Sequence, residues 1–415
     1  MSASIEGVEN FRLRARAWMK DNLGPILPQD ISQSCNSDEE ELLAVERDRR
    51  LQRRLFDGGF AGICFPREYG GLGLTASHQR AFNEELVGYE FPSRFAVPTF
   101  SPCAAVLLEF GTLEQKIRHL PAILRGEEVW VQMLSEPGGG SDVAGATTKA
   151  VYDGDAWVLN GSKVWTSRAW WADWGLILTR TNWDVPKHRG LTVFILPLRQ
   201  PTIEIRRIER LNGESEACQE FLTDVRVPDS DRVGELDTGW TIGTRWMYHE
   251  RMSSNSPYVT RPISVRSEAA EGHSVVDIAR GAGRLTDPVA LDLIGESRAL
   301  DIVTHALRKR VAAAAQNHID HSAIDRLFGG TARVRQATIA LDLAGAAAGA
   351  WSTEDEREMG LPGMDYLLRQ TSCIGGGTTE IARNVISERV LDMPREPSGD
   401  RDIPFRDVPR GPKRS

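Results

Sequence analysis

The sequence predicts an α+β protein of several domains: an N-terminal α-helical domain, a middle antiparallel β domain and a C-terminal α-helical bundle. Two observations lead to this fold class. Apolar positions recur at helical spacing on both sides of a central stretch, and short runs of β-branched and aromatic residues fill that stretch from about Val129. We place the domains at residues 1–127, 128–236 and 237–395, followed by a mobile tail at 396–415.

The N-terminal domain is expected to be helical except for one loop. Apolar positions recur at helical spacing over residues 5–20. Residues 38–54 have the mixed acidic and basic side chains that are typical of an exposed helix. The glycine-rich segment GFAGICFPREYGGLGLT at 59–75 interrupts this pattern, and 78–90 and 100–124 again look helical. We therefore expect a loop held between helices.

Short strand-like runs define the middle domain, among them KAVYD, AWVLN and LTVFILPL. Asp153-Gly154 lies between two of these runs and Asn160-Gly161 precedes a third, and both dipeptides favour tight primed turns. Turns this short join antiparallel neighbours, so we expect a meander of antiparallel strands rather than a parallel nucleotide-binding sheet.

Helical signals return after Gly239, where stretches rich in Ala and Leu predict a bundle. The last helix is expected to start after Gly375–Gly377 and to end before Pro394. Its apolar face comprises Ala382, Val385, Ile386 and Val390. The remaining tail is rich in proline and charge, which favours mobility or a contact with a neighbour.

Composition and charge exclude several classes of function. The chain of 415 residues has 50 basic and 58 acidic residues, a net charge of −8 and no basic patch, so we expect no nucleic-acid partner. No apolar run approaches the roughly 18 residues of a membrane span, and the N-terminal text lacks the apolar core of a signal peptide. We therefore expect a cytoplasmic protein without membrane contact. The five cysteines are scattered singly and the histidines lack metal-site spacing, so disulfides and a metal are not expected.

Two glycine runs could contact a ligand. Gly138–Gly140 precede Ser141, and such a turn can present backbone N–H groups and a hydroxyl to an anion or a polar cofactor edge. The run lacks the context of a P-loop or a dinucleotide fold, so taken alone it is better explained as a plain loop. Gly375–Gly377 lead through Thr378 into a helix N-terminus, which favours phosphate or a carbonyl oxygen, or is an ordinary helix entry.

Two further motifs also have a structural and a functional interpretation. Trp165 and Ser167 end an expected strand, where an indole could wall off a planar cofactor and a hydroxyl could donate to its ring. With 11 tryptophans in the chain, any single one is more often part of the core. Glu250-Arg251 lies in the segment TIGTRWMYHERM, which is expected to be helical. An isolated Glu-Arg pair on a helix is usually a solvated surface ion pair.

Four blocks in order resemble the acyl-CoA dehydrogenases, flavoenzymes built from a helical domain, a β domain and a helical bundle. The first is the loop segment at 59–75. The second and most specific block runs from FGTLEQKIRHLPAILRG through VQMLSEPGGGSDVAG to NGSKVWTSRAWWADWGLI. QEFLTDVRVPDSDRVGELDTGWTIGTRWMYHERM is similar to the segment that leads into the catalytic helix. IGGGTTEIARNVISERVLDMPRE is similar to the C-terminal signature. The resemblance spans nearly the whole chain.

The resemblance implies FAD as cofactor and assigns the residues that hold it. They are Gln132, Leu134 and Ser135 along the flavin edge, Gly140 and Ser141 at flavin or acyl-CoA, Trp165 against the isoalloxazine, Ser167 near N5, and Thr378 and Glu380 near the adenine half.

The resemblance also implies where the catalytic base lies. In one branch of the family a Glu precedes the Gly-Thr of the C-terminal signature, and here that position is Gly376. In another branch the base belongs to an ER dipeptide on the helix after the β domain, which matches Glu250, with Arg251 positioning it. Glu250 would remove the α-proton of an acyl-CoA, the β-hydride would pass to flavin N5 to give a trans-2-enoyl-CoA, and the N–H of Gly376 would donate to the thioester oxygen.

Two family motifs are altered in this chain. In the family, the Arg of an RxxFG motif reaches the FAD pyrophosphate across a dimer contact; here a different sequence around Arg280 stands in its place. The family's QxxGGxG motif is replaced by DLAGAAAG. Arg280 is therefore only a candidate for that contact, and the variant text resembles a bacterial branch that forms dimers or heterotetramers. Implied partners are the acyl-CoA substrate, electron-transfer flavoprotein, and further subunits in a homodimer, homotetramer or heterotetramer.

Two alternatives to a dehydrogenase stay open. One is an oxygen-using relative, either an acyl-CoA oxidase or a flavin monooxygenase. The other is a non-catalytic subunit that stabilises a catalytic partner. The identity of the acyl group is not encoded in any motif, although a base moved away from position 376 is typical of enzymes for branched, long or ring-bearing acyl groups.

Overall fold

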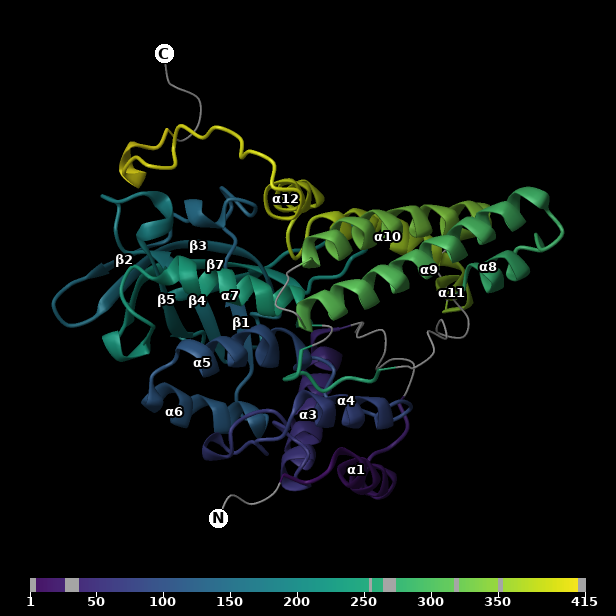
Figure 1. Ribbon diagram of the computed structural model, residues 1–415, viewed down its shortest axis with the longest axis horizontal. Coiled ribbons are helices and arrows are strands. Elements are labelled where there is room, and N and C mark those ends of the chain that lie inside the picture. The colour runs from purple at the N-terminus through teal and green to yellow at the C-terminus, as the bar shows by residue number, and fades with distance from the viewer. Residues whose placement is uncertain are drawn as a thin grey trace. The chain divides into compact units, whose positions relative to one another are not determined.

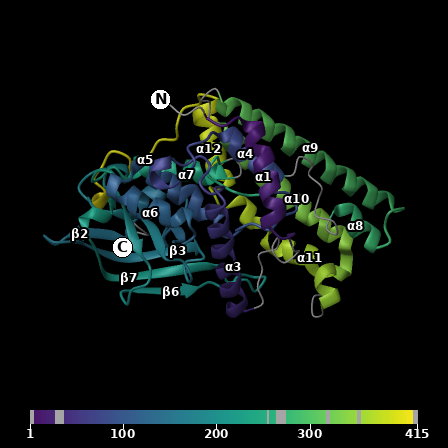
Figure 2. The ribbon, with the colours of Figure 1, turned by 90° about the horizontal axis from the view of Figure 1, so that it is seen from below.

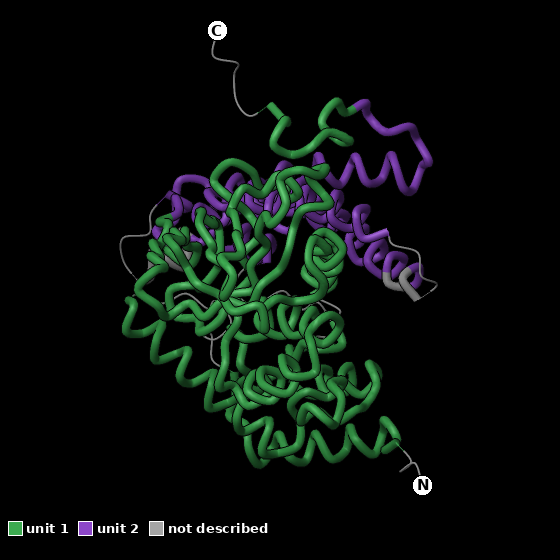
Figure 3. Tube along the Cα trace, turned by 90° about the vertical axis from the view of Figure 1, so that its left-hand side faces the viewer, with its two compact units in different colours: residues 1–209, 215–265, 398–415 green, residues 210–214, 266–397 purple. Residues whose placement is uncertain are grey.

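A computed structural model describes residues 5–26, 37–253, 256–263, 274–316, 321–349 and 354–409. The chain forms two compact units, which Figure 3 draws in different colours. Unit 1 comprises residues 1–209, 215–265 and 398–415, and unit 2 comprises 210–214 and 266–397. The expected helical, β and helical stretches all occur, and the domain boundaries proposed from the sequence stay predictions.

The N-terminal part of unit 1 is helical, as expected. Its helices begin at residues whose side chains satisfy the first backbone N–H groups: Ser37 accepts from Glu40, and Thr112 and Gln115 form a reciprocal capping box. The helices are α1 (Val8–Asn22), α3 (Asp38–Asp57), α4 (Ala76–Glu85), α5 (Ala105–Phe110) and α6 (Leu113–Leu124), with a short 3-10 turn η1 (Arg67–Tyr69) in the glycine-rich loop and the kinked segment η2 (Ala96–Ala104) before α5.

The middle of unit 1 is one eight-stranded sheet, within the described residues, in the order β6-β7-β3-β2-β4-β5-β8, with β1 paired to β4. Figure 2 shows β3, β7 and β6 side by side. The strands are β1 (Trp130–Met133), β2 (Lys149–Tyr152), β3 (Trp157–Ser167), β4 (Trp174–Arg180), β5 (Leu191–Pro197), β6 (Ile203–Arg207), β7 (Ala217–Val227) and β8 (Arg232–Val233). Most neighbours are antiparallel, but β4 pairs in parallel with both β1 and β2, which the meander expected from the sequence did not include.

One of the two expected turns is wrong. Asp153-Gly154 does turn the chain between β2 and β3, with the Asp153 side chain accepting from two following N–H groups. Asn160-Gly161 instead lies inside β3, at a shift in the register with β7. Gly161 has φ 154°, and a Cβ there would come within 2.7 Å of Thr148 Cα, so the glycine serves a bulge and a close backbone approach.

The sheet has an apolar layer on each face. One layer includes Val131, Ile177 and Phe194 and lies among the strands themselves. The other joins Leu176 and Ile195 of the sheet to the helix α7 (Gly239–Arg251) through Trp246. Figure 1 shows α7 beside β4 and β5. The sheet therefore fixes the position of the helix that carries Glu250.

Unit 2 is the expected helical bundle, arranged around α10 (Figure 1). The Arg335 side chain of α10 pairs with Glu296 of α9 at 2.6 Å, and Arg326 donates to Gly377 O at 2.7 Å, which holds the entry to α12. Its elements are α8 (Val275–Gly281), α9 (Pro288–Gln316), α10 (Ser322–Ala344), η7 (Gly345–Gly349), α11 (Glu354–Leu368), η8 (Arg369–Cys373), α12 (Thr379–Val385) and η9 (Ile386–Val390).

The end of the chain returns to unit 1. Residues 398–409, with the 3-10 turn η10 (Phe405–Asp407), pack on the loop between β4 and β5, and Phe405 is buried. The sequence left mobility and a contact with a neighbour open for this tail, and residues 398–409 make a contact with another part of the same chain. Phe405, an aromatic residue in a mostly polar segment, anchors the tail to unit 1. The average composition of the tail does not reveal the effect of this single residue.

Two features are absent from the described part of the chain. None of its helices has the length and hydropathy needed to cross a bilayer. No cluster of His, Cys, Asp and Glu side chains there has the geometry to hold a metal ion.

Candidate active site

The link between β1 and α7 is the centre of the candidate site. The indole Nε1–H of Trp246 donates to Gln132 Oε1 at 2.7 Å. Trp246 is fully buried, and Glu250 follows it by four residues, so the two side chains lie on the same face of α7. The face of α7 that carries Glu250 is therefore turned towards Gln132, the first expected flavin residue.

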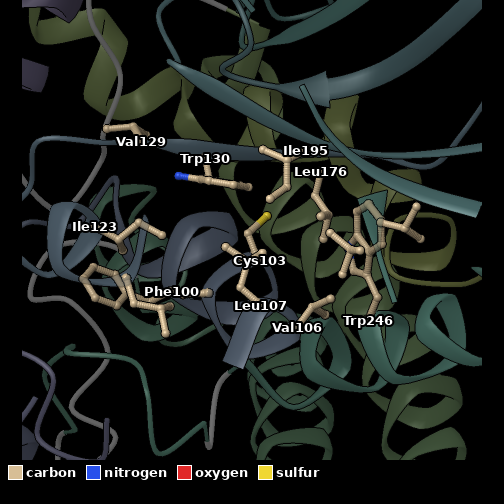
Figure 4. Close-up of a cluster of buried hydrophobic side chains, with 14 of the residues drawn as sticks. Phe100, Cys103, Val106, Leu107, Ile123, Val129, Trp130, Leu176, Ile195 and Trp246 are labelled. Carbon is tan, nitrogen blue, oxygen red and sulfur yellow. The ribbon is translucent and has the colours of Figure 1, made fainter. Parts of the chain in front are cut away.

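Glu250 is half-buried in the last turn of α7. Burial raises the pKa of the Cys103 thiol, and the negative charge of Glu250 adds to that rise, so the carboxylate lies near this fully buried cysteine. Figure 4 shows Cys103 at the centre of an apolar cluster with Trp130, Ile195 and Trp246 around it. Glu250 is thus directed to the apolar side of its helix, whereas Arg251 is exposed.

The end of α7 is fixed by two contacts that sequence reasoning missed. Ser101 Oγ donates to His249 O at 2.9 Å, and His249 Nε2 lies 2.8 Å from Glu109 Oε1. Burial lowers the pKa of His249 although Glu109 opposes it. Only the position of His249 beside Glu250 in the sequence could have pointed to this pair, because Ser101 and Glu109 are about 150 residues away.

The segment after β1 is bonded to β3 through its backbone. Leu134 O accepts from Lys163 Nζ at 3.0 Å, and Ser135 O accepts from Val164 N–H at 3.0 Å. Lys163 also contacts Glu136 at 2.9 Å. Burial alone would raise the pKa of Glu136. The charge of Lys163 and the hydrogen bonds donated by Thr147 and Thr148 outweigh burial and lower this pKa to about 2.

Gly138–Gly140 form an open turn. Glu136 and Gly139 exchange two backbone hydrogen bonds across it, at 3.1 and 2.9 Å. A Cβ on Gly138 would meet none of the described atoms within 4 Å, and one on Gly140 would make only an ordinary contact with Ser135. Neither packing nor a positive φ explains the glycines, and Gly140 and Ser141 are exposed. Backbone left uncovered in this way fits close approach of a ligand.

Trp165 stands out from β3. It lies at a bulge in the pairing with β7, has φ 64°, and its side chain is 61% exposed. A left-handed backbone is unfavourable for tryptophan, so the strands must hold it there: Val164 is bonded to Ser135, and Thr166 Oγ1 donates to Glu220 Oε2 at 2.7 Å. Ser167, half-buried, ends the strand opposite Ala217.

The remaining expected residues lie in unit 2, where the glycine turn and α12 form one group. Gly376 and Gly377 have φ 73° and 98°, and Thr378 is the N-cap of α12, accepting from Ile381 N–H at 3.1 Å. Glu380 is exposed and contacts Arg383 at 3.3 Å. This cap confirms the helix start expected from the sequence.

Arg280 is not close to that group within this chain. It pairs with Asp277 on α8, and the turn after α8 is bonded to the C-terminal end of α10 through Arg284 and Asp342 O. The turn before α12 contacts the other end of α10 at Arg326. Arg326 and Asp342 are about 24 Å apart at 1.5 Å per residue, so one ligand headgroup cannot touch both ends of α10 from the same subunit.

The expected residues of unit 1 therefore form a connected set. Bonds and shared elements run from Glu250 through Trp246 to Gln132, along β1 to Leu134 and Ser135, and across to β3 and Trp165. The set combines a half-buried carboxylate, an exposed aromatic face and open backbone. It suits proton removal beside a planar, polar-edged molecule.

Comparisons with known proteins agree with this arrangement. The acyl-CoA dehydrogenase N-terminal domain matches residues 8–127, and the middle domain matches residues 132–225. Acyl-CoA dehydrogenase IpdE1 of Mycolicibacterium smegmatis is 33% identical over 408 residues, which cover 94% of this chain and 99% of the relative. The chain belongs to the acyl-CoA dehydrogenase family. IpdE1 of Mycobacterium tuberculosis is 32% identical and covers 95% of this chain and 100% of its own.

Solved acyl-CoA dehydrogenase structures share the fold. A steroid ACAD named Tcur3481-Tcur3483 has a TM-score of 0.73 at 27% identity and covers 95% of this chain and 99% of that one. A glutaryl-coenzyme A dehydrogenase in complex with glutaryl-CoA has a TM-score of 0.66 at 22% identity and covers 97% and 99%, which shows the fold alone. As an acyl-CoA dehydrogenase, the enzyme is a flavoprotein oxidoreductase of lipid metabolism.

Proposed function

We propose that the enzyme removes the α- and β-hydrogens of an acyl-CoA thioester, giving a trans-2-enoyl-CoA, with Glu250 as the base and FAD as the cofactor. The observation behind this assignment is the bond from Trp246 to Gln132, because it turns the face of α7 that bears Glu250 towards β1. Family membership supports the reaction class.

The residues of unit 1 fit a flavin. Trp165 offers an exposed ring on a strained backbone, Ser167 a hydroxyl at the strand end, and Gly140 with Ser141 an uncovered loop. Leu134 and Ser135 would present their backbone N–H groups to the flavin edge at the end of β1, while their carbonyls are occupied by β3. FAD, when bound, would accept the hydride that leaves the β-carbon.

Glu250 would accept the α-proton on its carboxylate. An ordinary carboxylate, with a pKa of about 4.3, is a poor match for so weak a carbon acid. Glu250 lies beside the apolar cluster around Cys103 and at the negative end of the α7 dipole, two places that stabilise a carboxylate less than water does. Arg251, at the exposed end of the helix, would position α7 and take no proton.

The residues of unit 2 complete the proposal. The N–H of Gly376 would donate to the thioester oxygen, and Thr378 and Glu380 would contact the adenine half of FAD. Arg280 would contact the FAD of a neighbouring subunit, since its own chain keeps it away from α12. That role requires an oligomer.

Substrate and partners are the finer part of the proposal. A ring-bearing acyl group, such as one from a steroid, is favoured because a relative of 27% identity is described as a steroid ACAD and because Gly376 has no side chain to fill the space. Electron-transfer flavoprotein would reoxidise the enzyme in the cytoplasm. A second copy or a related chain would complete the oligomer, as in the described ChsE4-ChsE5 complex.

The test is anaerobic bleaching of the purified flavoprotein by a panel of linear, branched and ring-bearing acyl-CoA thioesters. Glu250→Gln should remain yellow and lose bleaching, by about a thousandfold in rate, because no base then takes the α-proton. Glu114→Gln, which alters an exposed carboxylate on α6, should bleach normally. Near-normal bleaching in Glu250→Gln would remove this residue from its role.

Two other results would replace the proposal. Rapid turnover with oxygen would indicate an acyl-CoA oxidase or a flavin monooxygenase. A colourless chain that acquires flavin only beside another chain would indicate a non-catalytic subunit.

A further inference from the structure

Apart from the two backbone bonds between Glu136 and Gly139, the glycine-rich turn at 138–140 has little packing of its own, so its position also depends on the residues that follow it. A Cβ on Gly138 would touch none of the described atoms, and Gly140 makes only one ordinary contact, with Ser135. Asp142, Ala144 and Ala146, by contrast, each interact with a cationic side chain from the end of β4 or from the β4–β5 loop. These three residues anchor the downstream end of the turn.

Arg180, at the end of β4, provides two of those anchors. Its side chain is fully buried; Nη2 donates to Ala144 O at 2.5 Å, Nε donates to Ala146 O at 3.1 Å and Nη1 donates to Lys187 O at 2.7 Å. The guanidinium therefore ties the segment after the glycines to the β4–β5 loop.

The C-terminal segment covers that guanidinium. The ring of Phe405 lies 3.8 Å from Arg180 Cζ, and Phe405 is 3% exposed. Two backbone bonds hold the ring in place: Phe405 N–H donates to Val185 O at 2.9 Å, and Arg406 N–H donates to Trp183 O at 3.0 Å. An aromatic face over a desolvated cation is a favourable contact.

The same segment reaches the turn by a second route. Lys187 Nζ lies 3.1 Å from Asp142 Oδ2 and 3.0 Å from Asp400 Oδ2, and its side chain is only 14% exposed. A hydrogen bond from Ser398 and the nearby Lys187 lower the pKa of Asp400 to about 2, so this carboxylate stays charged at neutral pH. Lys187 is thus held between the tail and the residue that follows Ser141.

We propose that residues 398–409 form a strap that holds the glycine-rich turn in its ligand-binding position, with Phe405 as the positioning residue acting through Arg180. The proposal rests on the proposed function, in which that turn contacts flavin or acyl-CoA. Phe405 is buried against Arg180 and would act through it, without contacting the ligand. Figure 3 draws the strap in the colour of unit 1, the unit that holds the turn.

Hydrogen exchange tests the structural half of the proposal in the full-length protein. In Phe405→Ala, amides of residues 138–147 should exchange on the order of tenfold faster, because local opening of the turn becomes easier. Phe405→Tyr keeps an aromatic ring at this position and should exchange as slowly as the unchanged protein. The exchange rate of Phe405→Leu should lie between those of the Tyr and Ala variants. Unchanged exchange in Phe405→Ala overturns the proposal.

Ligand binding tests the functional half. Phe405→Ala should weaken flavin affinity and raise KM for acyl-CoA by about fivefold while kcat at saturation stays within about twofold, because Glu250 and Trp246 are held elsewhere. Asp400→Asn should act in the same direction, and Asp402→Asn, an exposed carboxylate of the same strap, should not. Faster exchange with unchanged flavin affinity and KM overturns the positioning role.

These readouts separate the strap from the proposed function. Exchange and flavin affinity require no turnover, so they report on the strap even if Glu250→Gln shows that the base lies elsewhere. If Phe405→Ala does not fold, Phe405→Leu and the Asp400→Asn and Asp402→Asn pair supply the same comparison.

Discussion

Trp246 and Gln132, 114 residues apart, are joined by a 2.7 Å hydrogen bond from the indole to the side-chain amide. The bond links the first strand of the sheet to the helix that carries Glu250. Because Glu250 lies one turn beyond Trp246, any shift of α7 against β1 displaces its carboxylate. The position of the proposed base is therefore set by a contact of the middle of α7 with the sheet and not by its own terminal turn alone.

Trp246→Phe should test that link. The change leaves the part-buried amide oxygen of Gln132 without its donor and should lower the free energy of unfolding by about 1–2 kcal/mol. It should also slow bleaching by acyl-CoA, since α7 is no longer tied to β1. Trp240→Phe, on the same helix, is the control. Equal effects of the two changes on unfolding by urea and on bleaching would contradict the role of the bond.

Lys163→Met should be strongly destabilising. It leaves the Glu136 carboxylate buried without its cation, a loss of about 3–5 kcal/mol. Burial lowers the pKa of Lys163 although the Glu136 carboxylate opposes it, so the attraction between the two charges offsets only part of the cost of burying the ammonium. The double change with Glu136→Gln should recover part of the loss. The exposed Lys149→Met is the control, and similar urea midpoints for both lysine variants would contradict the prediction.

Glu220 should give the protein a pH-dependent stability. Burial raises the pKa of this carboxyl to about 8, although the Thr166 hydrogen bond opposes the rise. Between about pH 4.5 and pH 8 the folded state then holds a proton that the unfolded state has lost, so the free energy of unfolding falls as pH rises, by up to about 1.4 kcal/mol per pH unit. Glu220→Gln should remove this slope in urea titrations, whereas Glu204→Gln, exposed on β6, should keep it.

The general layout of the fold could be predicted from the sequence because periodicity and turn residues are local signals. The N-cap of α12 at Thr378 is one example, since an N-cap acts within a single turn. Asn160-Gly161 shows the limit of such signals: the dipeptide has the composition of a turn, but the approach of Thr148 makes it a bulge inside β3. The parallel pairing of β1 with β4 likewise depends on long-range contacts.

The candidate site shows the same division. The glycine-rich turn at 138–140 and the Glu250-Arg251 pair could be found from motifs because each is contiguous in sequence. Trp246, Cys103 and Phe405 could not, since each acts through a partner far along the chain. Buried tryptophans and a single phenylalanine in a polar tail have no periodic pattern to distinguish them.

Gly376→Ala should destabilise unit 2 by about 1–2 kcal/mol, because φ 73° is unfavourable for any residue with a Cβ. Gly375→Ala is a matched control, since a Cβ there would make only an ordinary contact at 3.6 Å with Thr371 O. The same strain argues against a base at position 376, so Gly376→Glu should not restore bleaching to Glu250→Gln. Restored bleaching, or equal thermal stability of the two alanine variants, would contradict this.

Trp165→Gly should separate stability from flavin binding. The indole is 61% exposed and its backbone has φ 64°, so replacing it with glycine removes little buried surface and relieves strain. The free energy of unfolding of the flavin-free protein should stay equal or rise by up to about 1 kcal/mol, while flavin affinity falls. Trp165→Ala loses the same ring but keeps the strain, so the difference between the two variants isolates the backbone. If glycine were instead less stable than alanine here, the left-handed conformation would cost nothing, and the unusual backbone of Trp165 would no longer indicate a functional site.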